Sequence, residues 1–262
     1  HFWYNPKKHP LNLDPWKKVI NKINNLKTLT TIGVVGKYTD LKDSYKSLTE
    51  ALIHGGLENN TKVEIKFLNS EKLNDTQINE ALSKVDGILV PGGFGYRGVE
   101  GKINSIKYAR ENNIPFFGIC LGMQLAVIEI ARNVLNLSKA NSTEFEDTDY
   151  PVIGLMTEWN NNQKIEKRSE DSNKGGTMRL GSYKAILKDN SLIKSIYNTK
   201  EINERHRHRY EVNINYLEKF EENGFKFTGM SPDNILPEVL ESTNHKWFIG
   251  VQYHPELKSR PQ

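Results

Sequence analysis

The chain has 262 residues, of which 36 are basic and 32 are acidic, and its formal net charge is +4. This length is enough for one large α/β domain or two small ones. The near balance of charge does not by itself indicate nucleic-acid binding, since a DNA-binding domain usually concentrates its basic residues on one face. Apolar runs stay far below the roughly 20 residues needed to cross a bilayer, so we expect no membrane partner.

The chain contains one cysteine, so it cannot form an intramolecular disulfide. We therefore expect a reducing, cytoplasmic compartment. The first residue is His1 rather than Met, and the residues that follow do not resemble a signal peptide. We expect the chain to be a piece of a longer protein.

The first 28 residues differ in composition from the rest. Prolines are followed by an apolar pattern with helical spacing over residues 16–23. This predicts the remnant of an interdomain linker with one short amphipathic helix over residues 1–28. The main domain is predicted over residues 29–262.

Apolar runs typical of buried strands alternate with helical stretches. The predicted strands lie at residues 32–35, 63–67, 87–90, 115–119, 226–230 and 247–253. The predicted helices lie at residues 44–57, 75–83, 101–111 and 123–135. This alternation indicates an α/β fold with a doubly wound, mostly parallel central sheet flanked by helices. Residues 158–181 are polar and contain glycines, which predicts a loop, either a lid or a surface insertion.

Cys120 lies between Gly118 and Gly122, after an apolar strand and before a predicted helix. A strand, a sharp turn and a helix make the elbow that exposes a nucleophile, and small residues suit its crowded backbone. The helix N-terminus favours the thiolate, which is the reactive form. A lone cysteine is more often a buried structural residue, but the flanking glycines favour a nucleophile here.

A base for this nucleophile is predicted at His254, which follows the last strong strand. Sites in parallel sheets form beyond the carboxyl ends of the strands, so His254 and Cys120 should share one edge. A neutral imidazole can take the thiol proton and later pass it to a leaving amine. Glu256 can fix the tautomer and orientation of the ring. The alternative for a single histidine is a surface residue without a catalytic role.

An oxyanion hole is predicted where another strand ends in consecutive glycines, Gly92 and Gly93. Glycines let backbone N–H groups approach a developing negative oxygen. The N–H of Leu121, directly after the nucleophile, would supply the second donor. A phosphate-binding loop is the competing interpretation, but the segment has neither of the usual phosphate-loop patterns.

Together these motifs resemble the class I, triad-type glutamine amidotransferases. Longer strings resemble the amidotransferase domains of the CTP synthase family, at residues 36–38, 91–102, 118–124, 131–134, 140–145, 175–181 and 204–213. The similarity runs from about Trp16 to Glu256. It implies a flavodoxin-like α/β fold and hydrolysis of L-glutamine to glutamate and ammonia by Cys120, His254 and Glu256.

The resemblance also implies how glutamine would bind. The backbone of Gly93 and Leu121 would stabilise the oxyanion, and Glu144 and Arg209 would pair with the substrate ammonium and α-carboxylate. An amino acid presents one charge of each sign, and each needs a partner in a partly dry cleft. The full set of implied substrate contacts is Gly93, Leu121, Gly122, Met123, Gln124, Glu144 and Arg209.

In this family GTP activates the glutaminase allosterically. The resemblance places that effector at Arg97, Gly98, Glu100 and Arg168. The alternative for Arg97 and Glu100 is a surface ion pair of little energetic value.

The resemblance further implies an N-terminal synthetase domain, absent from this chain, that uses ATP, Mg and UTP and receives the ammonia to make CTP in pyrimidine nucleotide biosynthesis. The whole enzyme is expected to be a homotetramer. The present domain is expected to need no cofactor and no metal, and to be weakly active or inactive alone.

Several alternatives remain at this point. Residues 205–209 alternate Arg and His, so on a strand the arginines would share one face and the histidines the other. A metal site or a nucleic-acid patch is the less favoured interpretation of this string, because neither interleaved aromatic residues nor a second cluster of ligands supports it, and we expect no nucleic-acid partner. The domain could further serve another amide acceptor, be a free γ-glutamyl hydrolase, or bind a partner without catalysis.

Overall fold

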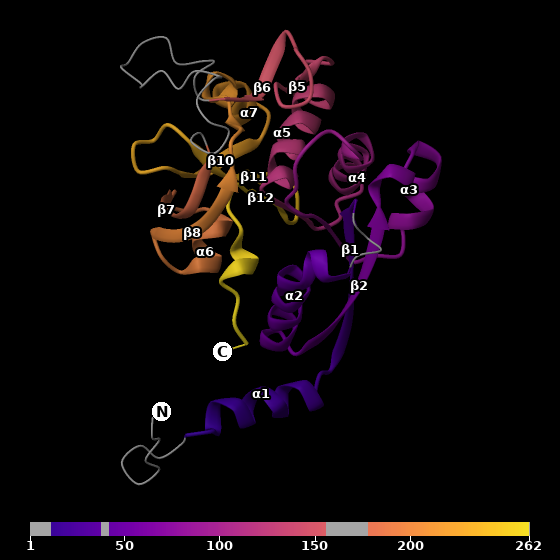
Figure 1. The fold of residues 1–262 in the computed structure, drawn as a ribbon, viewed down its shortest axis with the longest axis vertical. Helices are drawn as coiled ribbons and strands as arrows, with labels where there is room; N and C mark the ends of the chain where they lie inside the picture. The colour runs from indigo at the N-terminus through magenta and orange to yellow at the C-terminus, as the bar shows by residue number, and fades with distance from the viewer. Residues whose placement is uncertain (1–11, 38–41, 156–177, 262) are drawn as a thin grey trace, which may run out of the picture.

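The computed structural model describes residues 12–37, 42–155 and 178–261. Its centre is a nine-stranded sheet with the strand order β2-β1-β3-β4-β12-β11-β10-β7-β8. A smaller sheet has the order β5-β6-β9. Figure 1 shows the N-terminal helix α1 (Asp14–Asn24) set apart from the body of the domain.

Half of the large sheet is parallel. Neighbouring strands run in the same direction from β2 to β12. These strands are β1 (Thr28–Gly36), β2 (Thr61–Asn69), β3 (Gly87–Val90), β4 (Phe116–Ile119) and β12 (Phe248–Val251). All five were predicted from their apolar runs, and the predicted α/β class is confirmed.

The other half of the large sheet is antiparallel. It consists of β11 (Pro237–Ser242), β10 (Phe225–Met230), β7 (Arg179–Leu187) and β8 (Glu201–His208). The small sheet is formed by β5 (Ala140–Ser142), β6 (Tyr150–Gly154) and β9 (Glu211–Val212). Several of these strands carry exposed polar residues in alternation, as antiparallel strands with one solvated face do, so they present no continuous apolar run.

The predicted loop over residues 158–181 falls mostly outside the described residues, together with Arg168. At its far end the prediction is wrong, because residues 179–181 belong to β7. Leu180 is 65% exposed there, since that stretch of β7 pairs only with β8 and one face is open to solvent.

Helices cover both faces of the large sheet, as a doubly wound fold requires. They are α2 (Lys46–Glu58), α3 (Asp75–Leu82), α4 (Val99–Glu111), α5 (Leu121–Asn133), α6 (Leu192–Tyr197) and α7 (Leu217–Glu222). One apolar cluster joins the sheet to α3, α4, α5 and α7, and a second joins it to α2 and α6. Strand side chains alternate between the clusters, with Val35 in the first and Val34 in the second. Among the described residues, no helix is both long and apolar enough to span a bilayer.

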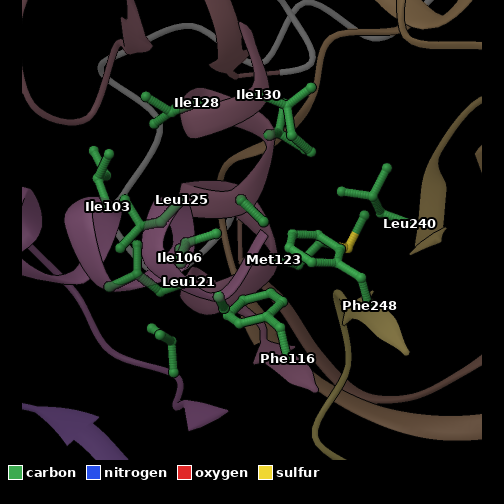
Figure 2. Close-up of a cluster of buried hydrophobic side chains, with 14 of the residues drawn as sticks. Ile103, Ile106, Phe116, Leu121, Met123, Leu125, Ile128, Ile130, Leu240 and Phe248 are labelled. Carbon is green, nitrogen blue, oxygen red and sulfur yellow. The ribbon is translucent and has the colours of Figure 1, made fainter. Parts of the chain in front are cut away.

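Helix α5 is the centre of the first cluster. Residues 121–131 are all buried, so this helix is enclosed rather than amphipathic. Figure 2 shows its side chains, including Met123, beside Phe116 of β4 and Phe248 of β12. The rings of Phe116 and Phe248 lie 4.5 Å apart. This packing fixes the position of the helix that begins directly after Cys120.

We expect Phe116→Ala to lower the free energy of unfolding by about 3–5 kcal/mol, because it leaves a cavity between β4 and β12. Urea denaturation would measure the change. Leu29→Ala is the control, since Leu29 is 59% exposed. Equal stability of the two variants would contradict this account of the core.

Candidate active site

Three adjacent parallel strands bring the candidate residues to one edge of the sheet. β3 leads into the glycine-rich residues 91–95, β4 ends directly before Cys120, and β12 is followed by His254. Ile119 and Val251 are partners in the register of β4 and β12. Because the carboxyl ends of parallel strands share one edge, segments far apart in the sequence meet there.

The backbone at Cys120 forms a strained elbow. Its φ of 53° and ψ of −104° lie outside the regions that side chains ordinarily favour. A Cβ on Gly122 would lie 2.1 Å from the carbonyl oxygen of Val90, and one on Gly118 would lie 2.7 Å from the backbone of Gly122. The Cys120 N–H donates to the carbonyl oxygen of Val251 at 2.7 Å. The glycines therefore allow three backbone segments to close around the cysteine.

Helix α5 begins at Leu121, so its first N–H groups have no carbonyl partner within the helix. The positive end of the helix dipole lies beside the sulfur and favours its anionic form. A Cβ on Gly93 would lie 3.4 Å from a methyl group of Leu121. The two segments predicted to supply oxyanion donors thus lie next to each other.

His254 is held from both sides. Its Nδ1 lies 2.8 Å from Oε1 of Glu256, and its backbone N–H donates to the carbonyl oxygen of Arg205 at 2.8 Å. A Cβ on Gly92 would lie only 2.6 Å from Cε1 of the ring. Nδ1 is bonded to Glu256, and the buried Nε2 has no hydrogen-bond partner within the described part of the chain, which leaves it available to the reacting atoms.

The surroundings of His254 favour its charged form. Burial alone would lower its pKa, but the hydrogen bonds and charges of Cys120 and Glu256 outweigh burial and raise the pKa to about 10. A pKa raised in this way favours the imidazolium form of the ring. An imidazolium beside Cys120 stabilises the thiolate.

A pocket of about 280 Å³ opens onto Cys120. Its lining includes Gly93, His254 and Glu256, and also Phe94 and Arg207, for which the sequence motifs gave no role. The remaining lining comes mainly from the turn before α2 and the first residues of that helix. The guanidinium of Arg207 lies 5.9 Å from the centre of the Phe94 ring. The alternation along residues 205–209 predicted that Arg207 shares a face with the other arginines, but it did not place that face beside Cys120.

The residues implied to bind glutamine do not all line this pocket. Glu144 accepts a hydrogen bond from the N–H of Gly95 at 2.8 Å. Burial raises the pKa of Glu144, and the Gly95 hydrogen bond and the charges of Lys37 and Arg209 act in the opposite direction. Arg209 lies just beyond the end of β8.

The helix residues implied in substrate binding point inward. The side chains of Leu121 and Met123 are buried in the apolar cluster of Figure 2. Gly122 packs against Val90, so these three positions offer backbone groups only. Gln124 is buried and donates to the carbonyl oxygen of Tyr210 at 2.8 Å.

The positions implied in GTP activation lie on the segment that leads into α4. Arg97 pairs with Glu71 at 3.0 Å, and Glu100 pairs with Arg132 at 3.0 Å. Gly98 is the N-cap of α4 and has a φ of 69°, a left-handed conformation that glycine adopts without strain.

The two histidines of the Arg-His string face the interior. His206 Nδ1 lies 2.9 Å from His208 Nε2, while Arg205 and Arg207 are exposed. This is the predicted alternation on a strand. Within the described ranges, no group of three or more His, Cys, Asp or Glu side chains is arranged to hold a metal ion.

The sequence profile of the family described as Glutamine amidotransferase class-I matches residues 40–262. The chain belongs to this family. A curated relative from Pelagibacter ubique, named CTP synthase, is 57% identical over 254 residues, which cover 97% of this chain and 47% of the relative. Another CTP synthase, from Zymomonas mobilis, is 57% identical over 96% of this chain and 47% of its own length. The chain thus spans about half the length of the curated relatives it matches.

A solved structure described as the glutaminase domain of Trypanosoma brucei CTPS with bound acivicin is also similar. It is 37% identical with a TM-score of 0.78, and the match covers 88% of each chain. Within the class I amidotransferases, the chain is therefore a glutaminase domain of the CTP synthase type. The predicted flavodoxin-like fold class agrees with this family.

We expect Cys120→Ala to lower the pKa of His254, because it removes the first of the partners that raise it. Histidine ¹⁵N shifts over a pH titration would measure the change. Because the folded pKa lies above the usual 6.5, the imidazolium stabilises the fold fully below about pH 6.5, and this contribution is lost as the pH rises through about 10. An unchanged His254 titration in the variant would contradict the pairing.

Proposed function

We propose that this domain hydrolyses L-glutamine to glutamate and ammonia with Cys120 as nucleophile. The observation that carries the proposal is the strained elbow, which puts the cysteine at a helix N-terminus beside the His254 imidazolium. Three segments converge there, and a pocket opens onto the sulfur. A structural cysteine would need none of these features.

In the proposed mechanism the Cys120 thiolate attacks the side-chain amide carbon of glutamine. The resulting oxyanion accepts hydrogen bonds from the N–H groups of Gly93 and Leu121. The His254 imidazolium protonates the leaving nitrogen, which departs as ammonia and leaves a γ-glutamyl thioester. The neutral imidazole then takes a proton from water, whose attack releases glutamate. Glu256 keeps Nδ1 protonated and Nε2 directed at the reacting atoms.

The proposed substrate contacts follow from charge. Glu144 pairs with the ammonium group of glutamine and Arg209 with its α-carboxylate. The positive charge of Arg209 is one of the influences that lower the pKa of Glu144, which supports assigning the two groups to one site. The side-chain carbonyl oxygen of Gln124 is the end of its amide that could accept from substrate, since its NH₂ group is bonded to Tyr210 and Gln252.

For the whole protein we propose CTP synthesis. A synthetase domain would lie N-terminal to this one and aminate UTP with the ammonia, using ATP and Mg. Residues 1–28 would connect the two domains, and the complete enzyme would be a cytoplasmic homotetramer. The support is that the curated relatives are about twice as long as this chain.

We also propose GTP as an allosteric activator that acts through Arg97, Gly98 and Glu100, with Arg168. The first three positions lie together on one segment at the start of α4, adjacent to the predicted oxyanion loop. The ion pair of Arg97 with Glu71 is exposed, and Glu100 is itself exposed although its partner Arg132 is partly buried; exposed ion pairs contribute at most about 1 kcal/mol. A charged nucleotide could therefore displace them at small cost.

A glutamine-like diazo-ketone tests the nucleophile directly. We expect the reagent to alkylate Cys120, detected by mass spectrometry of the digested protein, and glutamine to protect against it. His254→Ala should slow the labelling, because it removes the imidazolium that stabilises the thiolate. A folded sample that stays unlabelled, also with the synthetase partner supplied, would remove Cys120 from the proposal.

Arg209→Ala tests the substrate contact. We expect the KM for glutamine to rise by about tenfold or more with a smaller change in kcat, because the lost pair binds a group remote from the reacting carbon. Arg205→Ala is a matched control, since Arg205 lies on the exposed face of β8. Kinetics of Arg209→Ala that match this control would exclude Arg209 from the glutamine site.

A further inference from the structure

A continuous chain of buried hydrogen bonds ends on the sulfur of Cys120. The Nε2 of Gln124 lies 2.8 Å from the carbonyl oxygen of Tyr210 and 3.1 Å from Oε1 of Gln252. The Nε2 of Gln252 lies 3.7 Å from Sγ of Cys120. Gln252 is 0% exposed and Gln124 is 4% exposed, so water does not compete for these groups.

A backbone carbonyl determines the orientation of both amides. The Tyr210 oxygen can only accept, so the Gln124 atom beside it must belong to the NH₂ group. The second hydrogen of that NH₂ group needs another acceptor, which is Oε1 of Gln252. The NH₂ group of Gln252 is thereby turned toward the sulfur. The orientation of Gln252 follows from the chain of contacts alone.

The carbonyl that sets this orientation is itself held by a second donor. His208 Nδ1 lies 3.1 Å from the Tyr210 oxygen, so Nδ1 carries a proton. Burial keeps the pKa of His208 well below its usual value, and the ring is therefore neutral, with Nε2 as an acceptor. His206 Nδ1 donates to that Nε2 at 2.9 Å. Both lone pairs of the Tyr210 oxygen are thus occupied.

We propose that Gln252 is a further catalytic residue of this site, whose amide N–H donates to the Cys120 sulfur and stabilises the thiolate alongside His254. The inference rests on the proposed glutaminase function, because it concerns the same nucleophile. A donor directed at the sulfur lowers the energy of the anion more than that of the neutral thiol. The carbonyl oxygen of Arg207 lies 4.0 Å from the sulfur. It can only accept a hydrogen bond, so it stabilises the neutral thiol, which has a proton to donate.

Other charged groups also act on this sulfur. Those that line its pocket are His254 and Glu256 after β12, Arg207 on β8, Asp43 in the turn before α2, and Lys46 at the start of α2. A substitution at Gln252 leaves all of them in place. The effect of losing the amide donor can therefore be measured against a constant set of charges.

Alkylation by iodoacetamide tests the inference, because Cys120 is the single cysteine of the chain. The alkylation rate is measured against pH for the wild type and for Gln252→Met, which keeps an unbranched side chain and removes the donor. Thr228→Val is the matched control. It removes a buried hydrogen bond to Glu241, 2.7 Å long, in β10, two strands beyond β12.

In Gln252→Met we expect the pH of half-maximal alkylation to rise by about one unit, and the rate at pH 6 to fall about tenfold. Thr228→Val should follow the wild type. If Gln252→Met is folded and its curve of alkylation rate against pH superimposes on that of the wild type, the inference is overturned. If Gln252→Met does not fold, Gln252→Asn withdraws the amide by one methylene, and the same two outcomes apply.

The measurement needs no glutamine, so it separates this inference from the proposed function. One outcome is that the alkylation profile of Gln252→Met is shifted but the wild type never hydrolyses glutamine, even with a synthetase partner. This outcome would support Gln252 as a donor to the thiolate and refute the proposed function. Glutamine hydrolysis together with superimposed profiles would refute the role of Gln252 alone.

Discussion

The strained backbone at Cys120 is the constraint on which the rest of the site depends. A non-glycine residue at a φ of 53° with a ψ of −104° costs of the order of 1–3 kcal/mol and persists only where its surroundings enforce it. Here the surroundings are backbone atoms, since Gly118, Gly122 and Val90 approach so closely that no side chain fits between them. The enclosed helix α5 then holds the elbow from the core side. Cys120 faces the pocket from this turn, while its backbone N–H stays hydrogen-bonded to Val251 of β12.

Once the sulfur is placed there, the groups around it favour one charge state. The N-terminus of α5 and the His254 imidazolium both stabilise an anion, and the NH₂ group of Gln252 points at the same atom. These groups come from the start of α5, which follows β4, and from the segment directly after β12, and they are adjacent because β4 and β12 are parallel neighbours. The parallel half of the sheet therefore positions the nucleophile and also determines which charged and polar groups surround it.

The sequence predicted the parts of this arrangement that depend on local signals. Cys120 and His254 each follow a continuous apolar run, and strands with both faces covered are easily identified by such runs. The antiparallel half was mostly missed because β7 and β8 alternate exposed and buried residues. Gln252 carries no motif of its own. Its relation to the sulfur arises from Gln124 on α5 and from the Tyr210 carbonyl, which are brought together only by the fold.

The oxyanion loop and the proposed substrate site are linked through Glu144. Its carboxylate accepts the N–H of Gly95, two residues from the predicted oxyanion donor Gly93. Lys37 holds the same loop by a hydrogen bond to the carbonyl oxygen of Phe94. A glutamine ammonium placed at Glu144 would share this carboxylate with the loop, so binding of substrate and orientation of the oxyanion donors cannot be independent. Burial already raises the pKa of Glu144, and an ammonium partner would lower it again. The same carboxylate would thus couple the charge of the substrate to the geometry of the loop beside the nucleophile.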